Sequence, residues 1–138
     1  MTNQEQQNLV ATQLLYDATG RGDWDATAAM LTDDFFITEA PGLPFAGVYS
    51  GRNALRDLFT KVMGMMEVTG LDLQQMLAGG DWVMVLLDIV AHDTDGSEIR
   101  IPIAEGTRFR DGKACEIKPY YFDPALVHRA VAAKQIAA

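Results

Sequence analysis

Apolar residues in the first half of the chain recur at the spacing expected of three helices. Within residues 9–18, apolar residues recur every three or four positions, and a break that contains glycine ends this pattern. Asp23 is placed to accept the free backbone N–H groups of a second helix over residues 24–31. The broadest apolar face belongs to residues 54–66, with Ser50 as the candidate N-cap. The pattern therefore predicts three N-terminal helices.

Strand-like patterns interrupt and then follow these helices. Aromatic and β-branched residues dominate residues 33–39, which predicts a brief strand that ends in a stretch rich in proline and glycine. Four longer apolar segments come later, at residues 68–77, 82–91, 98–110 and 113–122. Glycine and aspartate occupy the tight turns between them, and such turns join antiparallel neighbours. We therefore predict a four-stranded antiparallel meander.

The last helical signal directly follows the meander. Asp123 and Pro124 form the pair expected of an N-cap and a first helical residue. The complete pattern predicts an α+β domain in which the N-terminal helices pack on one face of a strongly curved antiparallel sheet. A sheet that bends around a long helix leaves a conical, apolar cavity, and such preformed concave sites are where small molecules bind.

The composition of the chain argues against some classes of binding partner. The 138 residues, 49% of them apolar, suffice for one domain over residues 1–138 with a single core. Eleven Lys and Arg residues stand against nineteen Asp and Glu residues, a net charge of −8, which argues against nucleic acids and anionic membranes as partners. The longest apolar run, residues 82–87, is far shorter than the roughly 20 residues of a membrane-spanning helix. Since the polar start also lacks a signal-peptide pattern, we expect a soluble, cytoplasmic protein.

Cysteine and histidine give no sign of a metal site or a disulfide. Cys115 is the only cysteine in the sequence, so it has no internal partner. His92 and His128 have no potential ligands at the spacing that zinc sites require. We expect neither a metal nor an organic cofactor.

Three segments carry a shared pattern of caps, turns and strand ends. Residues 22–35 combine Gly-Asp-Trp-Asp with Leu-Thr-Asp-Asp-Phe, residues 41–47 form a Pro/Gly loop, and residues 108–123 join Arg-Phe-Arg-Asp-Gly-Lys to Tyr-Phe-Asp. In this order they resemble the SnoaL-like branch of the nuclear-transport-factor-2-like superfamily, which includes ketosteroid isomerases, polyketide cyclases and limonene epoxide hydrolases. The resemblance extends over nearly the whole chain. It implies a cone-shaped α+β barrel, a small apolar ligand in the interior and a homodimer through the outer sheet face, and it says less about the chemistry.

The resemblance gives two glutamates a possible role in catalysis. Glu39, at the end of the brief strand, stands where the isomerases have their general base, and Glu105 stands where they keep a protonated acid. Two carboxyl groups in one apolar pocket would repel each other as anions, so one should keep its proton. The isomerases use aspartates, and the longer glutamates displace each carboxyl by about 1.5 Å, which argues against a steroid substrate.

Three further side chains are candidates for the same site. Tyr16 and Tyr121 are possible second hydrogen-bond donors, although an ungapped count places Leu15 where the isomerases have their tyrosine. Asp123 resembles an aspartate that takes part in acid–base chemistry in the cyclases and epoxide hydrolases, but a helix cap explains it more simply. Ile103 replaces the arginine that the epoxide hydrolases place two residues before the strand carboxylate, which disfavours epoxide hydrolysis.

What the resemblance implies for these residues is cofactor-free proton transfer on an apolar carbonyl or cyclic substrate, of the isomerase, cyclase or dehydratase type. Glu39 would be the base and Glu105 the neutral hydrogen-bond donor. The alternatives are a solvated Glu39 and a structural ion pair of Glu105 with Arg100 or Arg108. The whole domain could then be a non-catalytic binding module for an apolar ligand, or an accessory dimerisation domain.

Overall fold

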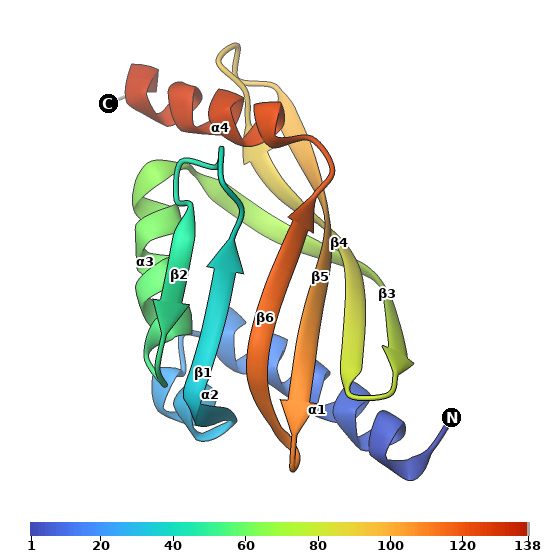
Figure 1. Cartoon of the computed structure of the whole chain (residues 1–138). Helices are drawn as coiled ribbons and strands as arrows, with labels where there is room; N and C mark the ends of the chain where they lie inside the picture. Colours follow the sequence, from blue (N-terminus) through green and yellow to red (C-terminus); the bar gives the residue numbers. More distant parts are fainter. Residues whose placement is uncertain (138) are drawn as a thin grey trace.

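A six-stranded sheet curves around the N-terminal helices in the computed structural model, which describes residues 1–137 (Figure 1). The strands lie in the order β2-β1-β6-β5-β4-β3. In chain order the elements are α1 (Asn3–Gly20), α2 (Trp24–Ala29), β1 (Leu31–Glu39), β2 (Gly47–Ser50), α3 (Ala54–Met65), β3 (Val68–Gly79), β4 (Trp82–His92), β5 (Glu98–Arg110), β6 (Lys113–Tyr121) and α4 (Pro124–Ala137). The predicted α+β class and the curved sheet are confirmed.

The antiparallel meander forms as the sequence predicts. β3, β4, β5 and β6 pair consecutively, and every pair is antiparallel. One junction of the sheet departs from the prediction, because β1 pairs with β6 in parallel. β2, α3 and the first three strands of the meander separate β1 from β6 in sequence, so local turn signals could not have revealed this pairing.

The strand β2 was not predicted, and it changes the start of the third helix. β2 pairs antiparallel with β1, placing Gly47 opposite Glu39. Ser50 is its last residue and caps no helix; α3 instead begins after Asn53, whose side chain makes no capping hydrogen bond. The expectation of a Ser50 cap is therefore wrong, because four residues of strand occupy the segment that was assigned to a loop.

Side-chain caps explain where the other N-terminal helices begin. Thr2 and Glu5 form a capping box at α1, which therefore starts before the first apolar residue of its predicted range. The Asp23 carboxylate accepts a hydrogen bond of 3.1 Å from the backbone N–H of Ala26 and caps α2, as predicted. Because α2 ends at Ala29, β1 begins earlier than the pattern suggested, at Leu31.

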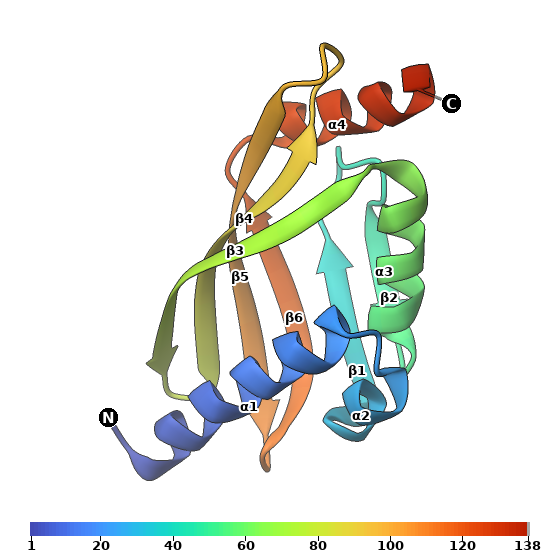
Figure 2. The ribbon, with the colours of Figure 1, turned by 180° about the vertical axis from the view of Figure 1, so that it is seen from behind.

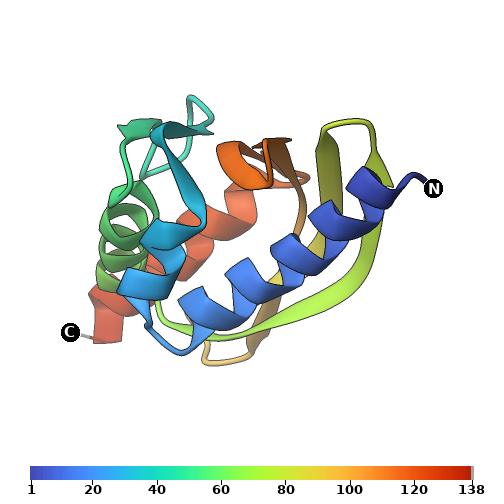
Figure 3. The ribbon, with the colours of Figure 1, turned by 90° about the horizontal axis from the view of Figure 1, so that it is seen from below.

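The helices surround one face of the sheet. α1 crosses the concave face of the meander, where it contacts β3 and β4, and α3 lies beside β1 and β2 (Figure 2). Seen from below, the sheet bends around α1 from β6 to β3 (Figure 3). α4 contacts β4 and β5 at the opposite end of the molecule from the N-terminus of α1 (Figure 1). No helix within residues 1–137 combines the length and apolar composition needed to cross a membrane.

Alternation along the strands separates the two faces of the sheet. Val83, Val85 and Leu87 of β4 point inward with Ile101 and Ile103 of β5, and all five are buried in the core. The residues between them point to the outer face, where Arg100 and Arg108 form ion pairs with carboxylates of β3, β4 and β6. The concave face is therefore apolar, and the cations of the meander lie on its convex side.

Candidate functional site

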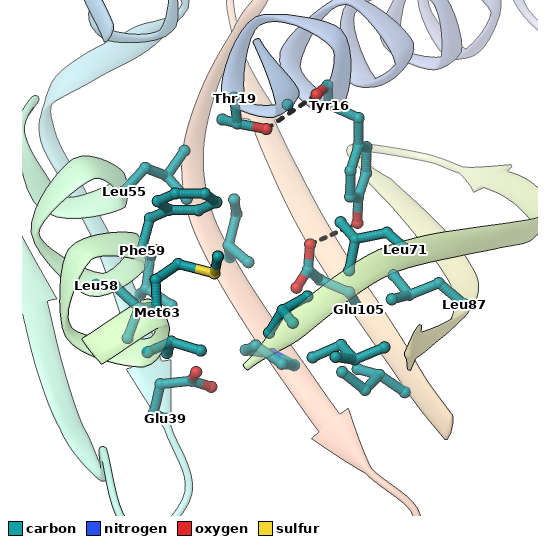
Figure 4. Close-up of a pocket in the computed structure, with 18 of the residues that line it drawn as sticks. Tyr16, Thr19, Glu39, Leu55, Leu58, Phe59, Met63, Leu71, Leu87 and Glu105 are labelled. Carbon is teal, nitrogen blue, oxygen red and sulfur yellow. Dashed lines mark hydrogen bonds between the residues drawn. The ribbon is translucent and has the colours of Figure 1, made fainter. Parts of the chain in front are cut away.

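A cavity of about 190 Å³ lies between the N-terminal helices and the concave face of the sheet (Figure 4). Its walls are mainly aliphatic and aromatic, with residues from α3 facing residues from the meander. They include Leu58, Phe59, Val62, Met63, Leu87 and Ile103. The broad apolar face predicted for the third helix thus lines the cavity and also packs in the core.

Apart from the indole of Trp24, the polar side chains of the lining carry carboxyl or hydroxyl groups. Tyr16, Thr19, Glu39, Glu105 and Tyr121 line the cavity, and no Lys, Arg or His of the described chain does so. The Thr19 hydroxyl is already engaged, since it donates to the carbonyl of Tyr16 over 3.0 Å. Two glutamates and two tyrosines therefore supply the groups available for chemistry.

Strand register brings the two glutamates to the same cavity. Glu39 is the last residue of β1, and Glu105 lies on β5, two positions after the inward-facing Ile103. β6 runs between these strands and contributes Ile117, Pro119 and Tyr121 to the lining. Glu39 is only 3% exposed, which excludes the alternative of a solvated carboxylate at a strand end.

Glu105 has a specific hydrogen-bond partner on the first helix. The Tyr16 hydroxyl donates to Oε1 of Glu105 over 2.5 Å (Figure 4). Neither arginine considered as a structural partner reaches Glu105, because Arg108 pairs with Glu116 and Arg100 pairs with Asp72 on the outer face. The structural ion-pair alternative is therefore wrong, and a phenol takes the place of the arginine.

The position of Tyr16 also corrects the ungapped count along the first helix. Leu15, which the count placed at the site of the isomerases' tyrosine, is 4% exposed and packs in the core. Tyr16 lines the cavity. Adjacent helical residues differ by about 100° around the helix axis, so a slip of one position exchanges a core residue for a cavity residue.

Burial shifts the proton equilibria of all four groups. Burial first and the charge of Glu105 second raise the pKa of Glu39 to about 8. Burial also raises the pKa of Glu105, but the hydrogen bond from Tyr16 opposes this shift. The pKa values of Tyr16 and Tyr121 are raised by burial first and by the neighbouring carboxylates second. Both phenols therefore stay protonated, and the two carboxyl groups share fewer than two negative charges at neutral pH.

Asp123 does not belong to this group. It is absent from the cavity lining, and its Oδ1 accepts a hydrogen bond of 3.1 Å from the backbone N–H of Ala125. This bond satisfies a free N–H group in the first turn of α4. The structure thus places Asp123 in the capping role that the sequence favoured.

One aromatic residue of the site was not identified from the sequence. Trp24, the first residue of α2, lines the cavity and packs edge-on against Phe59 with ring centroids 5.2 Å apart. Its position at a helix start gave no spacing signal that pointed inward. Within residues 1–137, no three His, Cys, Asp or Glu side chains gather in an arrangement that could hold a metal ion.

Comparison of the sequence with protein families identifies one relationship. The sequence model described as a SnoaL-like domain matches residues 12–117, which include Tyr16, Glu39 and Glu105. A search of the curated proteins finds no match.

Solved structures with the same fold have little sequence identity to the chain. A protein from Jannaschia sp. that carries the name of SnoaL-like polyketide cyclases is 15% identical, with a TM-score of 0.77 and 96% of each chain covered. TerC, co-crystallised with polyporic acid, is 18% identical, with a TM-score of 0.76 and coverage of 91% of this chain and 98% of its own. A protein from Catenulispora acidiphila with a ketosteroid isomerase-like fold, in complex with trimethylamine, is 14% identical, with a TM-score of 0.69 and coverage of 87% and 91%. These similarities confirm the α+β cone as the fold.

Proposed function

The chain belongs to the SnoaL-like domain family, and on this premise we propose that it is an enzyme that moves a proton within a small apolar carbonyl or cyclic substrate, without a cofactor. The observation that carries the proposal is the placement of two carboxyl groups, Glu39 and Glu105, in one apolar cavity with two phenols. Isomerisation, cyclisation and dehydration next to a carbonyl all need a base for a C–H proton and a donor for the oxygen.

The apolar walls of the cavity bind the substrate, and its polar groups transfer the proton. Aliphatic and aromatic side chains bind the hydrocarbon part of the substrate and exclude water, which strengthens the electrostatic interactions of the carboxyl groups. Of the pair Glu39 and Glu105, the ionised member takes a proton from carbon and the neutral member donates to the carbonyl oxygen. The Tyr121 hydroxyl is a second donor to that oxygen. General acid–base catalysis of this kind contributes about 10²- to 10⁴-fold in rate.

The size of the cavity limits the substrate. A cavity of about 190 Å³ is somewhat larger than the roughly 150 Å³ that holds a benzene molecule in an engineered protein core. It therefore suits a molecule with one or two rings better than a four-ring steroid. One protein of this fold carries the name of SnoaL-like polyketide cyclases and another is described as having a ketosteroid isomerase-like fold, which is consistent with proton-transfer chemistry on cyclic carbonyl compounds.

Turnover of a panel of small unsaturated ketones tests the proposal. The panel contains β,γ-unsaturated cyclic ketones, β-hydroxyketones and aldehyde precursors of cyclisation, followed by absorbance and by NMR. We expect the combined E39Q/E105Q variant to lose at least about 10²-fold in kcat/KM on any accepted substrate. Asp123→Asn is the matched control, because it changes a carboxylate outside the cavity and asparagine also caps helices. Unchanged turnover in E39Q/E105Q would show that these glutamates do not catalyse.

A second candidate function is the non-catalytic binding of a small organic cation. The cavity has two carboxyl groups and no cationic side chain from the described residues, and Trp24 and Phe59 present aromatic surface to it. A relative of the same fold binds trimethylamine. Calorimetry with trimethylammonium and with the neutral, similarly shaped tert-butanol separates the two functions. Micromolar binding of the cation alone, together with no turnover across the panel, would favour the binding module over the enzyme.

We also propose a homodimer through the outer face of the sheet, in accordance with the family resemblance. Trp82, Leu86 and Tyr120 bring apolar surface to this convex face, where Leu86 is 38% exposed. Light scattering coupled to size-exclusion chromatography should give twice the chain mass, and Leu86→Arg should give the single chain mass. A monomeric wild-type protein would contradict the proposal.

The buried free thiol of Cys115 is consistent with a reducing compartment such as the cytoplasm.

A further inference from the structure

We infer that Glu105 is the ionised member of the carboxyl pair and acts as the base, while Glu39 keeps its proton and acts as the acid. This inference rests on the proposed function and assigns the roles within its site. It reverses the roles that the family resemblance implies, in which the residue at the end of the first strand is the base. The reversal follows from the hydrogen-bond partners that this chain gives to each carboxyl group.

Glu105 has a donor that stabilises its negative charge. The Tyr16 hydroxyl donates to Oε1 of Glu105, and the raised pKa of Tyr16 keeps the phenol proton in place at neutral pH. A hydrogen bond to an ionised acceptor is about twice as strong as one between neutral groups. The other carboxyl oxygen of Glu105 points away from Tyr16 and remains free to accept a proton (Figure 4). Tyr16 is therefore a positioning residue that acts through Glu105.

Glu39 lacks such support. Its Oε1 is buried without any hydrogen-bond partner, and the side chain is 3% exposed. An unpaired carboxylate in this position would lose its hydration without compensation, which costs far more than burial of the neutral acid. The pKa of Glu39 is accordingly raised to about 8, by burial first and by the charge of Glu105 second. At neutral pH Glu39 presents an O–H group, for which a substrate carbonyl is a suitable acceptor.

No cation offsets this difference. The titratable groups that line the cavity are Tyr16 on α1, Glu39 on β1, Glu105 on β5 and Tyr121 on β6, and α2, α3, β3 and β4 add none from the described residues. The nearest arginine of β5, Arg108, is engaged with Glu116 on the convex face of the sheet. The single negative charge therefore falls on the carboxyl group that has the phenol donor.

The proton transfers balance without another reactant. The free carboxylate oxygen of Glu105 takes a proton from the carbon next to the carbonyl, and the C–H electron pair becomes the C=C bond of an enol. The carbonyl π pair takes the proton of Glu39 and forms the enol O–H bond. From a β,γ-unsaturated ketone this enol is a dienol: Glu105 returns its proton to the γ-carbon, the C=C bond moves to the α,β position, and the carbonyl forms again as Glu39 recovers the proton from oxygen. The substrate is isomerised, and both glutamates end in their starting states.

Carboxyl titration by ¹³C NMR tests the assignment without needing a substrate. Protein labelled at the glutamate side-chain carboxyl carbon is titrated as the wild type, and E39Q and E105Q identify the two resonances. We expect Glu105 to ionise at a lower pH than Glu39. Tyr16→Phe should shift the Glu105 transition to higher pH, whereas Tyr121→Phe, which removes a cavity phenol that is not bonded to Glu105 in the structure, should leave the order of the two transitions unchanged. Circular dichroism confirms that each variant is folded.

The outcomes separate this inference from the proposed function. A Glu39 that ionises before Glu105, or a Glu105 transition that does not respond to Tyr16→Phe, would overturn the assignment whether or not the protein turns over a substrate. The expected order of ionisation supports the assignment. If that order is found and the ketone panel shows no turnover, the proposed enzyme function is wrong, while the charge distribution in the cavity stands.

Discussion

The hydroxyl of Tyr16 on α1 and the carboxyl group of Glu105 on β5 are hydrogen-bonded across 89 positions of sequence. This contact holds the first helix over the concave face of the meander, beside the carboxyl group that Glu105 brings to the cavity (Figure 4). It also gives a buried carboxylate the donor that makes its charge tolerable. One hydrogen bond thus contributes both to packing of the helix and to the proton affinity of the site.

Tyr16→Phe should lower the free energy of unfolding by about 1.5–3 kcal/mol at neutral pH, the range measured for hydrogen bonds to charged groups. The loss should be smaller at pH 4, where Glu105 is protonated and the missing bond joins two neutral groups. Urea denaturation at both pH values measures it. Tyr120→Phe is the control, because Tyr120 is 51% exposed and phenylalanine keeps the ring that the proposed dimer face uses, so it should change stability by less than about 0.5 kcal/mol. Equal losses for the two variants would mean that the bond is absent in solution.

The meander was predictable from sequence because local chemistry determines it. Glycine and aspartate turns separate segments with a period of two, and β5 begins and ends at the predicted residues, Glu98 and Arg110. β2 was not predictable, because its four residues follow a Pro/Gly loop and contain too few positions to reveal alternation. The parallel contact of β1 with β6 depends on the folded sheet as a whole.

The orientation of α1 shows why the site was only partly predictable. Its buried stripe includes Asn8 and Thr12, and the Thr12 hydroxyl donates to the carbonyl of Asn8 over 2.8 Å. Two apolar residues of the same helix, Val10 and Leu14, are exposed. The inward face therefore could not be read from hydrophobicity, and Tyr16 could not be placed by counting. The resemblance assigned Glu39 and Glu105 to one pocket, and both line the cavity because strand alternation determines which side of a sheet a residue faces.

Glu39→Gln should change how stability depends on pH. The pKa of Glu39 is raised in the folded protein to about 8, above the ordinary value of 4.5. Between these pH values the unfolded chain has lost the proton and the folded protein retains it, so wild-type stability falls as pH rises through this window. The variant lacks this dependence. The free energy of unfolding of the variant should exceed that of the wild type by little at pH 4 and by a few kcal/mol at pH 8.

Chemical denaturation of both proteins from pH 4 to pH 9 measures the difference. Glu67→Gln is a suitable control, because Glu67 lies outside the cavity that holds Glu39. Its stability curve should follow that of the wild type. A constant difference between Glu39→Gln and the wild type across the pH range would mean that Glu39 is ionised in the folded state.

The cavity should discriminate against anions. It contains Glu39 and Glu105 and no cationic side chain from residues 1–137, so a bound carboxylate would be buried without a counter-charge. We expect 4-phenylbutan-2-one to bind at least about tenfold more tightly than 3-phenylpropionate at pH 7, which corresponds to about 1.4 kcal/mol. Calorimetry measures both dissociation constants. Equal affinities would show that these ligands bind outside the cavity or that a counter-charge reaches it.

A tryptophan in place of Leu71 should obstruct the cavity at its mouth. Leu71 lines the cavity from β3 and is also 51% exposed, so its side chain lies where the cavity meets solvent. The added ring of Leu71→Trp can occupy the opening without displacing core residues, and stability should change by less than about 1 kcal/mol. Binding of 4-phenylbutan-2-one should weaken at least about tenfold, because the ligand must displace the indole.

Leu14→Trp is the matched control: Leu14 is 52% exposed on α1 and does not line the cavity, so this variant should bind as the wild type does. If Leu71→Trp also binds like the wild type, the ligand reaches the glutamates by another opening, and β3 does not form the entrance.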